Sequence, residues 1–145
     1  MDIQGEYRLD APPEQVWRDL NDPEVLRECI PGCESMSKVG DDEYECDVIA
    51  KFGPVKAKFK SRLAVCDSNP PHSYAIVGEG KGGVAGFGKG RADVRLTPDG
   101  VGTLLSYNAS LSVGGKLAQI GSRLLGATTR KLSDQFFSAF SARFD

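Results

Sequence analysis

Residue types that carry catalysis are scarce in this chain, and their spacing is unfavourable. The single histidine, His72, follows two prolines in an expected turn, which favours a surface position over a role as general base. With no second histidine, a Ser-His-Asp or Cys-His arrangement has only this one candidate. Cys29 and Cys33 are four residues apart, but no further Cys or His lies nearby to complete a set of metal ligands. We therefore expect a protein that is not an enzyme and that holds no metal ion or cofactor.

Two glycine-rich motifs would bind phosphate only if they joined a strand to a helix. Residues 78–83 match G-x-G-x-x-G, and residues 83–89 match G-x-x-x-x-G-K. The segment after Lys89 is strand-like rather than helical, and it begins with Gly90 instead of Ser or Thr. We interpret the region as two glycine-bent strands joined by a loop. We expect this loop to be a mobile, mildly apolar gate that comprises Gly82, Gly83, Val84, Ala85 and Gly86.

Length and composition favour one domain, residues 1–145, in the cytoplasm. A chain of 145 residues can bury roughly two-thirds of its unfolded surface, enough for a hydrophobic core without disulfides. The four cysteines form no CxxC pair and we see no export signal, so we expect reduced thiols. We also see no apolar run of about 18 residues that could span a membrane. The formal net charge of −2 argues against nucleic acid as a partner.

The C-terminal stretch, residues 115–144, has the pattern of one long helix. It contains no proline, and its larger apolar residues recur every three or four positions, as on one side of a helix. At about 1.5 Å per residue this helix would be on the order of 40 Å long. The residues beside the apolar stripe are small: Ala118, Gly121, Ser122, Gly126, Ala127 and Thr128. Such a face either lets another backbone approach closely or leaves space for a molecule that is not protein.

A hairpin around Gly53-Pro54 is the clearest strand pair in the sequence. It places opposite charges across from each other on one face, as with Asp47 and Lys60, and apolar residues on the other face. The expected pairs on the apolar face are Phe52 with Val55, Ala50 with Ala57, Val48 with Phe59, Cys46 with Ser61, and Tyr44 with Leu63. The row of cations within residues 56–62 could attract a phosphate backbone or an anionic membrane. We favour the alternative, the solvated side of an antiparallel hairpin.

The other elements complete an α+β architecture. Residues 3–9 alternate as a first strand, Pro13 and Pro23 each open a short helix, and further strands are expected within residues 73–113. Glycines alternate on the inward face from Gly86 onwards, and glycine in a strand often marks a close approach to the backbone. We expect about six to seven strands in a curved antiparallel sheet around a long C-terminal helix, with two short helices after the first strand.

Between the sheet and the long helix we predict an apolar cavity with a few hydroxyl groups, suited to a lipophilic molecule. Inward-facing aromatic residues, the glycine face and the helix stripe supply the expected lining. It comprises Trp17, Tyr44, Phe59, Tyr74, Ile76, Gly88, Tyr107, Ala109, Leu117, Ile120, Gly121 and Leu124.

Three segments resemble one known family, the CoxG family (the G component of carbon monoxide dehydrogenase), which belongs to the START-like (SRPBCC) helix-grip superfamily. The similarity lies in PPEQVWRDLNDPEVLRECIPGCESM near the N-terminus, in GKGRADVRL, and in TLLSYNASLSVGGKLAQIGSRLL running into DQFFSAF. The IPGC and GG-K-LAQIGSRL elements are together quite specific, and the resemblance covers nearly the whole chain. It implies a helix-grip fold with a deep hydrophobic cavity between the sheet and the long helix.

The resemblance also implies partners. Members of the CoxG family are associated with a molybdenum-containing carbon monoxide dehydrogenase or a related hydroxylase, and are thought to help place that enzyme at the cytoplasmic membrane. We therefore expect a molybdenum hydroxylase of this type as partner, and peripheral contact at the inner face of the membrane. Longer members continue into a linker and an apolar C-terminal segment, whereas this sequence stops at Asp145, so we do not expect anchoring by a tail.

Three functions are compatible with these expectations. The leading hypothesis is a non-enzymatic carrier that holds the isoprenoid tail of a respiratory quinone, with tyrosine hydroxyls near the mouth orienting the quinone head. The second is a pure assembly or membrane-recruitment factor whose cavity is idle. The third is a small cyclase or hydrolase, as some helix-grip proteins are, which would need a titratable group inside the cavity.

Overall fold

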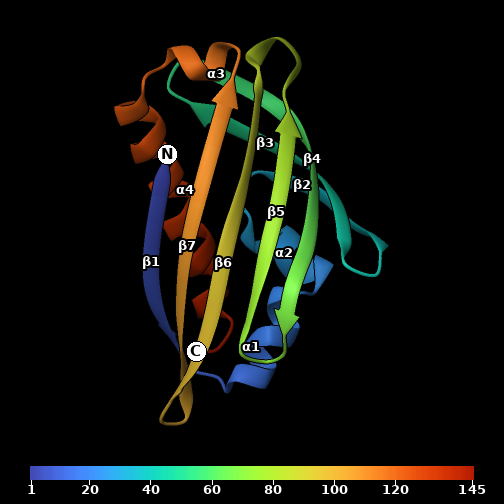
Figure 1. Ribbon diagram of the computed structural model, residues 1–145, viewed down its shortest axis with the longest axis vertical. Coiled ribbons are helices and arrows are strands. Elements are labelled where there is room, and N and C mark those ends of the chain that lie inside the picture. Colours follow the sequence, from blue (N-terminus) through green and yellow to red (C-terminus); the bar gives the residue numbers. More distant parts are fainter.

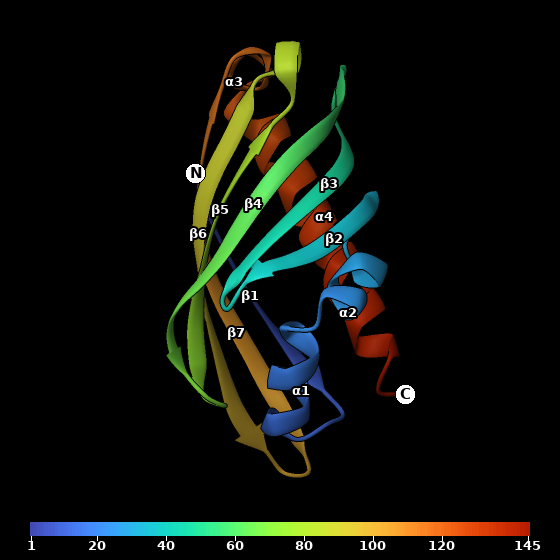
Figure 2. The same cartoon turned by 90° about the vertical axis from the view of Figure 1, so that its right-hand side faces the viewer.

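Seven antiparallel strands form one curved sheet that wraps around the C-terminal helix in the computed structural model, which describes residues 1–145 (Figure 1). The order across the sheet is β1-β7-β6-β5-β4-β3-β2. The strands are β1 (Asp2–Leu9), β2 (Cys33–Gly40), β3 (Glu43–Phe52), β4 (Val55–Asn69), β5 (Ser73–Lys81), β6 (Phe87–Asp99) and β7 (Gly102–Gly114). Figure 2 shows the long helix running diagonally across the concave face of this sheet. The expected helix-grip architecture is confirmed.

Two short helices follow the first strand, as expected, and they cover the lower end of the sheet in the view of Figure 1. They are α1 (Pro13–Leu20) and α2 (Pro23–Cys29). Both have proline in the first turn, where the missing N–H has no helical partner to lose. The Asp22 carboxylate accepts a hydrogen bond from the backbone N–H of Glu24 at 2.9 Å, which caps the start of α2.

The hairpin of β3 and β4 has the register expected from the sequence, pair by pair from Phe52–Val55 to Tyr44–Leu63. On its outer face, Arg62 forms an ion pair with Glu45 at 3.1 Å between exposed side chains. Strand β2, which the sequence pattern did not reveal, adds an edge next to β3. Met36 is its only buried residue, so the alternation of apolar and polar residues that marks a half-buried strand is absent.

The C-terminal helix is broken, which corrects the expectation of one continuous helix. One turn, α3 (Lys116–Gln119), is separated from α4 (Ser122–Ala142) at Ile120 and Gly121. Gly121 has φ of +91°, a conformation that a helix cannot contain and that glycine adopts without the steric cost of a side chain. Helix α4 has 21 residues and is therefore about 32 Å long.

The filled part of the hydrophobic core lies at the lower end, between α1, α2, the sheet and the C-terminal half of α4. Its fully buried residues include Phe140, Leu9, Leu96 and Leu105. The one buried polar residue, Thr103, donates its hydroxyl to the backbone carbonyl of Ala11 at 2.7 Å, which satisfies the group inside the core. No helix is both long enough and apolar enough to span a membrane.

Candidate ligand-binding cavity

An apolar cavity of about 300 Å³ lies between the sheet and the helices α3 and α4, above the filled core. Strands β3 to β7 supply its walls, and ten of its lining residues are hydrophobic. The lining comprises Val48, Ala50, Phe52, Phe59, Ser61, Leu63, Gly78, Glu79, Gly80, Gly88, Lys89, Gly90, Leu111, Val113, Leu117, Leu125 and Leu132. Most of the apolar side chains in this set are only half-buried, so the cavity is accessible to solvent.

The cavity divides the buried side chains into two groups. Eighteen buried residues form the lower core, and a separate cluster of three, Phe59, Ala85 and Leu117, lies at the upper end. Between the two groups the inward face of β5 and β6 carries glycine at four positions that line the cavity, two on each strand. At Gly88 an added Cβ would have Val113 Cγ1 as its nearest neighbour, at 3.7 Å, which is ordinary contact. Space is therefore kept at this position, as the sequence pattern indicated.

The three-residue cluster lies at the upper end of the cavity, and we call it the plug. Ala85 belongs to the 3₁₀ turn η1 (Gly83–Ala85) and is buried between Phe59 of β4 and Leu117 of α3. The loop is tied to itself by a hydrogen bond from the N–H of Gly82 to the carbonyl of Gly86 at 2.8 Å. None of the residues expected to form the gate loop lines the cavity itself, but Ala85 packs against Phe59 and Leu117, which do, and Val84 is 86% exposed. The mobility of this loop stays a prediction.

Three of the twelve expected lining residues, Phe59, Gly88 and Leu117, line the cavity. The structure places the others elsewhere. Tyr44, Tyr74 and Tyr107 are buried in the lower core, and Trp17, Ile76 and Ala109 pack against it. The cavity lies above them because α1, α2 and the aromatic residues of α4 fill the space at the lower end, where Phe137 stacks on Tyr107.

The three expected residues at the start of the C-terminal helix do not line the cavity either. Gly121 is exposed and breaks the helix, and Ile120 is half-buried at that break. Leu124 is 40% exposed and reaches the β3–β4 turn, where its Cδ2 lies 2.5 Å from where a Cβ on Gly53 would be. The break rotates these positions out of the register that a continuous helix would give them.

The lining expected from the sequence did not include the apolar residues on the inward face of the β3–β4 hairpin, at the end of β7 and on the inner side of α4. The missed residues are Val48, Ala50, Phe52, Leu63, Leu111, Val113, Leu125 and Leu132, with Ser61 and three further glycines. The hairpin register already placed the first four on the inward face, so that signal was present in the sequence. The position of the cavity along the strands could not be predicted from the sequence, because it depends on where the short helices pack.

Tyrosine hydroxyls do not face the cavity, which corrects the expectation that they lie near its mouth. Tyr44 donates its hydroxyl to the backbone carbonyl of Asn21 at 2.7 Å, and Tyr7 donates to the carboxylate of Asp134. Burial, followed by the bond to Asp134, raises the pKa of Tyr7. Burial and the neighbouring Tyr44 likewise raise the pKa of Tyr74. The one hydroxyl that lines the cavity belongs to Ser61.

Groups suited to catalysis or metal binding do not gather at the cavity. No histidine, cysteine or aspartate lines it, and Glu79 and Lys89 border it from strands while their side chains are exposed. His72 is exposed in the β4–β5 turn at the opposite end. No group of three or more His, Cys, Asp or Glu side chains is arranged to hold a metal ion. All four cysteines are free thiols.

A larger groove of about 550 Å³ lies on the other face of the sheet and has a different character. Charged side chains that point away from the helix surround it, among them Arg62, Glu79 and Arg91. Sites for small apolar ligands are lined mainly by hydrophobic residues, as is the smaller cavity under the helix, where ten of the 17 lining residues are hydrophobic. We therefore take the smaller cavity as the candidate site.

Comparison with known proteins agrees with this geometry. The family model for CoxG, the G component of carbon monoxide dehydrogenase, matches residues 5–144. The chain belongs to the CoxG family. The resemblance noted in the sequence is thereby confirmed. A comparison with curated proteins gave no significant match.

Solved structures similar to this CoxG-family protein share its fold over almost the whole chain. A conserved protein from Geobacillus kaustophilus is 35% identical, with a TM-score of 0.92 and coverage of 99% of this chain and 95% of that one. A START superfamily protein from Mycobacterium smegmatis is 14% identical, with a TM-score of 0.73 and coverage of 99% and 96%. The Zhui aromatase/cyclase from Streptomyces sp. R1128 is also 14% identical, with a TM-score of 0.71 and coverage of 99% and 92%. The last two similarities show the START-like fold alone.

Proposed function

We propose that this CoxG-family protein is a non-enzymatic carrier that holds a lipophilic molecule, the isoprenoid tail of a respiratory quinone, in the cavity under α4. In this proposal it serves a molybdenum hydroxylase of the carbon monoxide dehydrogenase type, at the inner face of the cytoplasmic membrane. The observation that carries the proposal is the apolar space between the filled core and the plug, in a chain of this family.

The lining favours a hydrocarbon chain over a polar ligand. Each CH₂ group transferred from water into such a site contributes about 0.8 kcal/mol, so ten buried carbons give roughly 8 kcal/mol before the cost of association. A volume of about 300 Å³ is at the lower end of the range for small-molecule sites. A cavity of this size therefore holds a segment of the tail, with the rest of the ligand extending beyond it.

The placement of polar groups limits how a quinone head would be held. The buried tyrosines lie in the lower core, so the Ser61 hydroxyl is the one side-chain hydroxyl that lines the cavity. We therefore expect affinity to depend on the tail and only weakly on the head. The same scarcity of titratable groups supports a binding role over a cyclase or hydrolase, because acid–base catalysis needs such a group within reach of the substrate.

The test combines extraction of the purified protein with titration. Mass spectrometry of the organic extract is expected to detect a co-purifying quinone or lipid, and a short-chain quinone is expected to bind saturably. Gly88→Leu places four carbons in the cavity and should abolish binding, whereas Ser112→Leu adds the same side chain at an exposed position of β7 and should not. An empty extract together with no saturable binding would exclude the carrier function. Capture of the hydroxylase by Gly88→Leu protein under those conditions would instead support a recruitment factor with an idle cavity.

A further inference from the structure

The end of the molecule that carries the plug also concentrates positive charge. Three segments meet there: residues 50–57 around the β3–β4 turn, residues 80–88 around η1, and residues 113–124 from the end of β7 to the start of α4 (Figure 1, Figure 2). Both β4 and α3 contact η1, and Leu124 reaches the turn at Gly53. We call this end of the molecule the basic tip.

The basic tip contains five cations and no carboxylate. They are Lys51, Lys56, Lys81, Lys116 and Arg123. All five side chains are exposed, and none lies within 4.0 Å of an acidic group, whereas the eight ion pairs of the protein lie elsewhere. Because the whole chain has a formal charge of −2, the rest of the molecule carries −7. The charge is thus strongly segregated, although the net charge is small.

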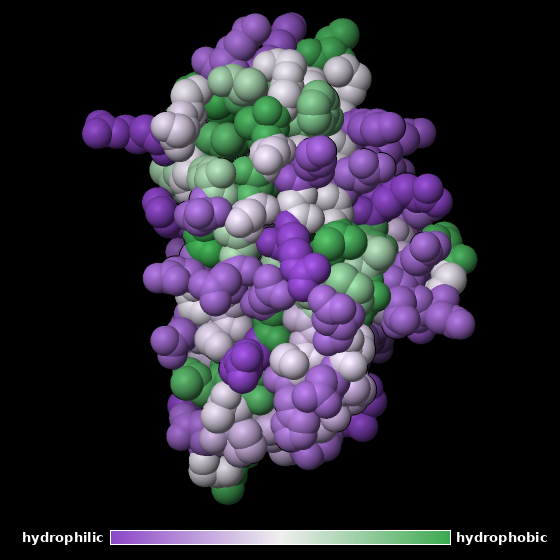
Figure 3. All heavy atoms as spheres, in the orientation of Figure 1, coloured by the Kyte–Doolittle hydropathy of each residue, from purple (hydrophilic) through white to green (hydrophobic).

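Apolar side chains are exposed among these cations. Val84 at η1 is 86% exposed, Phe87 at the start of β6 is 47% exposed, and Leu124 is 40% exposed. Figure 3 shows apolar atoms gathered near the upper ends of β6 and β7, with hydrophilic atoms around them. Exposed apolar residues set among unpaired lysines match the chemistry of a phospholipid surface, which offers anionic headgroups above a hydrocarbon layer.

The residue types favour a lipid surface over a protein partner at this end. Four of the five cations are lysines, and lysine is depleted in protein–protein interfaces, where arginine, tyrosine and tryptophan are enriched. Each lysine carries a strongly hydrated charge on a flexible stem, which suits attraction to a diffuse layer of anionic headgroups. Lys56 is the one member of the row of cations on β4 that lies in the basic tip, and unlike Lys58 and Arg62 it forms no ion pair.

We infer that the basic tip docks the protein on the anionic surface of a phospholipid bilayer, with Val84 and Phe87 in the headgroup layer. In this orientation the plug of Phe59, Ala85 and Leu117 faces the hydrocarbon. A lipophilic tail could then pass between the cavity and the bilayer without crossing water. The docking surface stands on charge and exposure alone, whereas this passage rests on the proposed carrier function.

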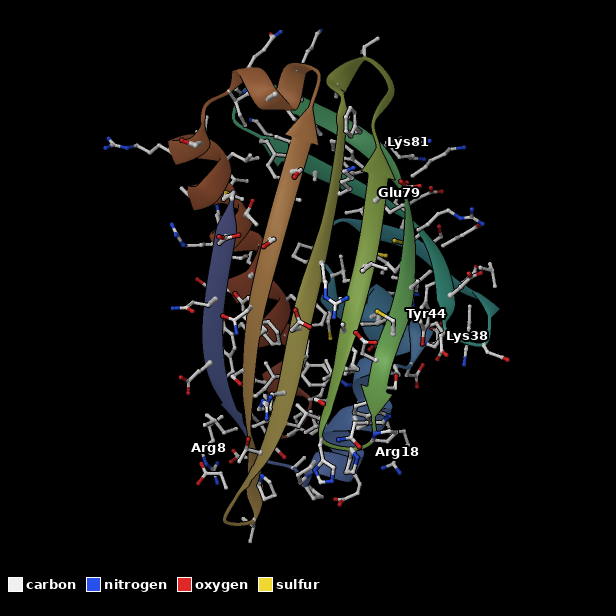
Figure 4. All side chains as sticks on the ribbon, in the orientation of Figure 1. Arg8, Arg18, Lys38, Tyr44, Glu79 and Lys81 are labelled. Carbon is white, nitrogen blue, oxygen red and sulfur yellow. The ribbon has the colours of Figure 1, made fainter.

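Vesicle flotation tests the docking surface. The protein is expected to float with vesicles of equal parts phosphatidylcholine and phosphatidylglycerol, to bind phosphatidylcholine vesicles far more weakly, and to dissociate as salt is raised. Each cation near an anionic surface contributes a factor of about five, so the double variant Lys81→Gln and Lys116→Gln should weaken binding about 25-fold. The control Arg18→Gln and Lys38→Gln removes two exposed cations away from the tip and should leave binding unchanged (Figure 4).

A pair of valines separates the apolar contribution from the charge. Val84 and Val101 are 86% and 88% exposed, and they lie at opposite ends of the molecule, at η1 and at the β6–β7 turn. Val84→Asp should weaken flotation, and Val101→Asp should weaken it much less. Equal effects of the paired variants, or equal binding to the two kinds of vesicle, would overturn the inference. Binding of a short-chain quinone measured without vesicles reports separately on the carrier function.

Discussion

Substitution of Gly88 by leucine is expected to stabilise the protein, which is unusual for a large side chain placed inside a fold. At this position a Cβ would meet Val113 Cγ1 at 3.7 Å and Leu111 Cδ1 at 3.8 Å, so the first added carbon has normal contacts. The remaining carbons would extend into the cavity of about 300 Å³. Gly90 provides a matched control, because it lies two residues away on the same face, yet a Cβ there would be 2.5 Å from the Ser110 carbonyl oxygen.

The expected gain follows from two contributions. Burial of a leucine side chain is worth about 1.5–3 kcal/mol, reduced here because the cavity is accessible to solvent. Removal of a glycine from a strand adds about 0.5–1 kcal/mol by lowering the entropy of the unfolded chain. Gly88→Leu should therefore raise the free energy of unfolding by about 2 kcal/mol, which corresponds to roughly 4–8 °C in Tm. Gly90→Leu should lower the same free energy by about 1–3 kcal/mol, because the β6 backbone must move away from β7.

Urea unfolding followed by circular dichroism, together with the quinone titration, measures both consequences. The reasoning requires Gly88→Leu to gain stability and lose ligand binding, and Gly90→Leu to lose stability. If both variants were destabilised equally, the space beside Gly88 would not be available to a side chain. If Gly88→Leu bound quinone as the natural protein does, the ligand would not occupy this cavity.

Three more predictions concern the plug, the lower core and the response to pH. Leu117→Ala should lower the free energy of unfolding by about 2–4 kcal/mol and speed the release of bound quinone in stopped-flow measurements, because it removes part of the plug. Phe140→Ala, at a position with no exposed surface, should cost about 3–5 kcal/mol in urea unfolding but leave quinone affinity unchanged in the protein that remains folded. Burial raises the pKa of the Cys46 thiol from its ordinary value near 9 to about 11, so the folded state holds this proton more tightly than the unfolded state. The contribution of this thiol to the free energy of unfolding is therefore fully present below about pH 9 and is lost as the pH rises through about 11. The total loss is on the order of 2 kcal/mol. Urea midpoints from pH 8 to 11 should fall less steeply for Cys46→Ala, and identical slopes would refute the assignment.

Local patterns in the sequence determined most of the secondary structure. The β3–β4 register was predictable because one turn at Gly53-Pro54 satisfies both the apolar face and the charged face, and any slip by one residue would exchange the two faces. The starts of α1 and α2 were predictable from prolines that tolerate only a first turn. The alternating glycines indicated space correctly at Gly88, where an added Cβ would make only ordinary contacts, but not at Gly90, where it would be 2.5 Å from the Ser110 carbonyl oxygen.

Only the tertiary structure decided where along the strands the cavity lies and which residues surround it. The inward tyrosines belong to the core, and Trp17 packs against it, because α1, α2 and the C-terminal half of α4 cover the lower end of the sheet, a contact between segments far apart in the chain. The break at Gly121 was hidden because periodicity reports which side of a helix a residue would occupy, not whether the helix is continuous. The basic tip likewise emerges only when three separate segments meet, because each contributes just one or two cations and the net charge of the chain gives no sign of their segregation.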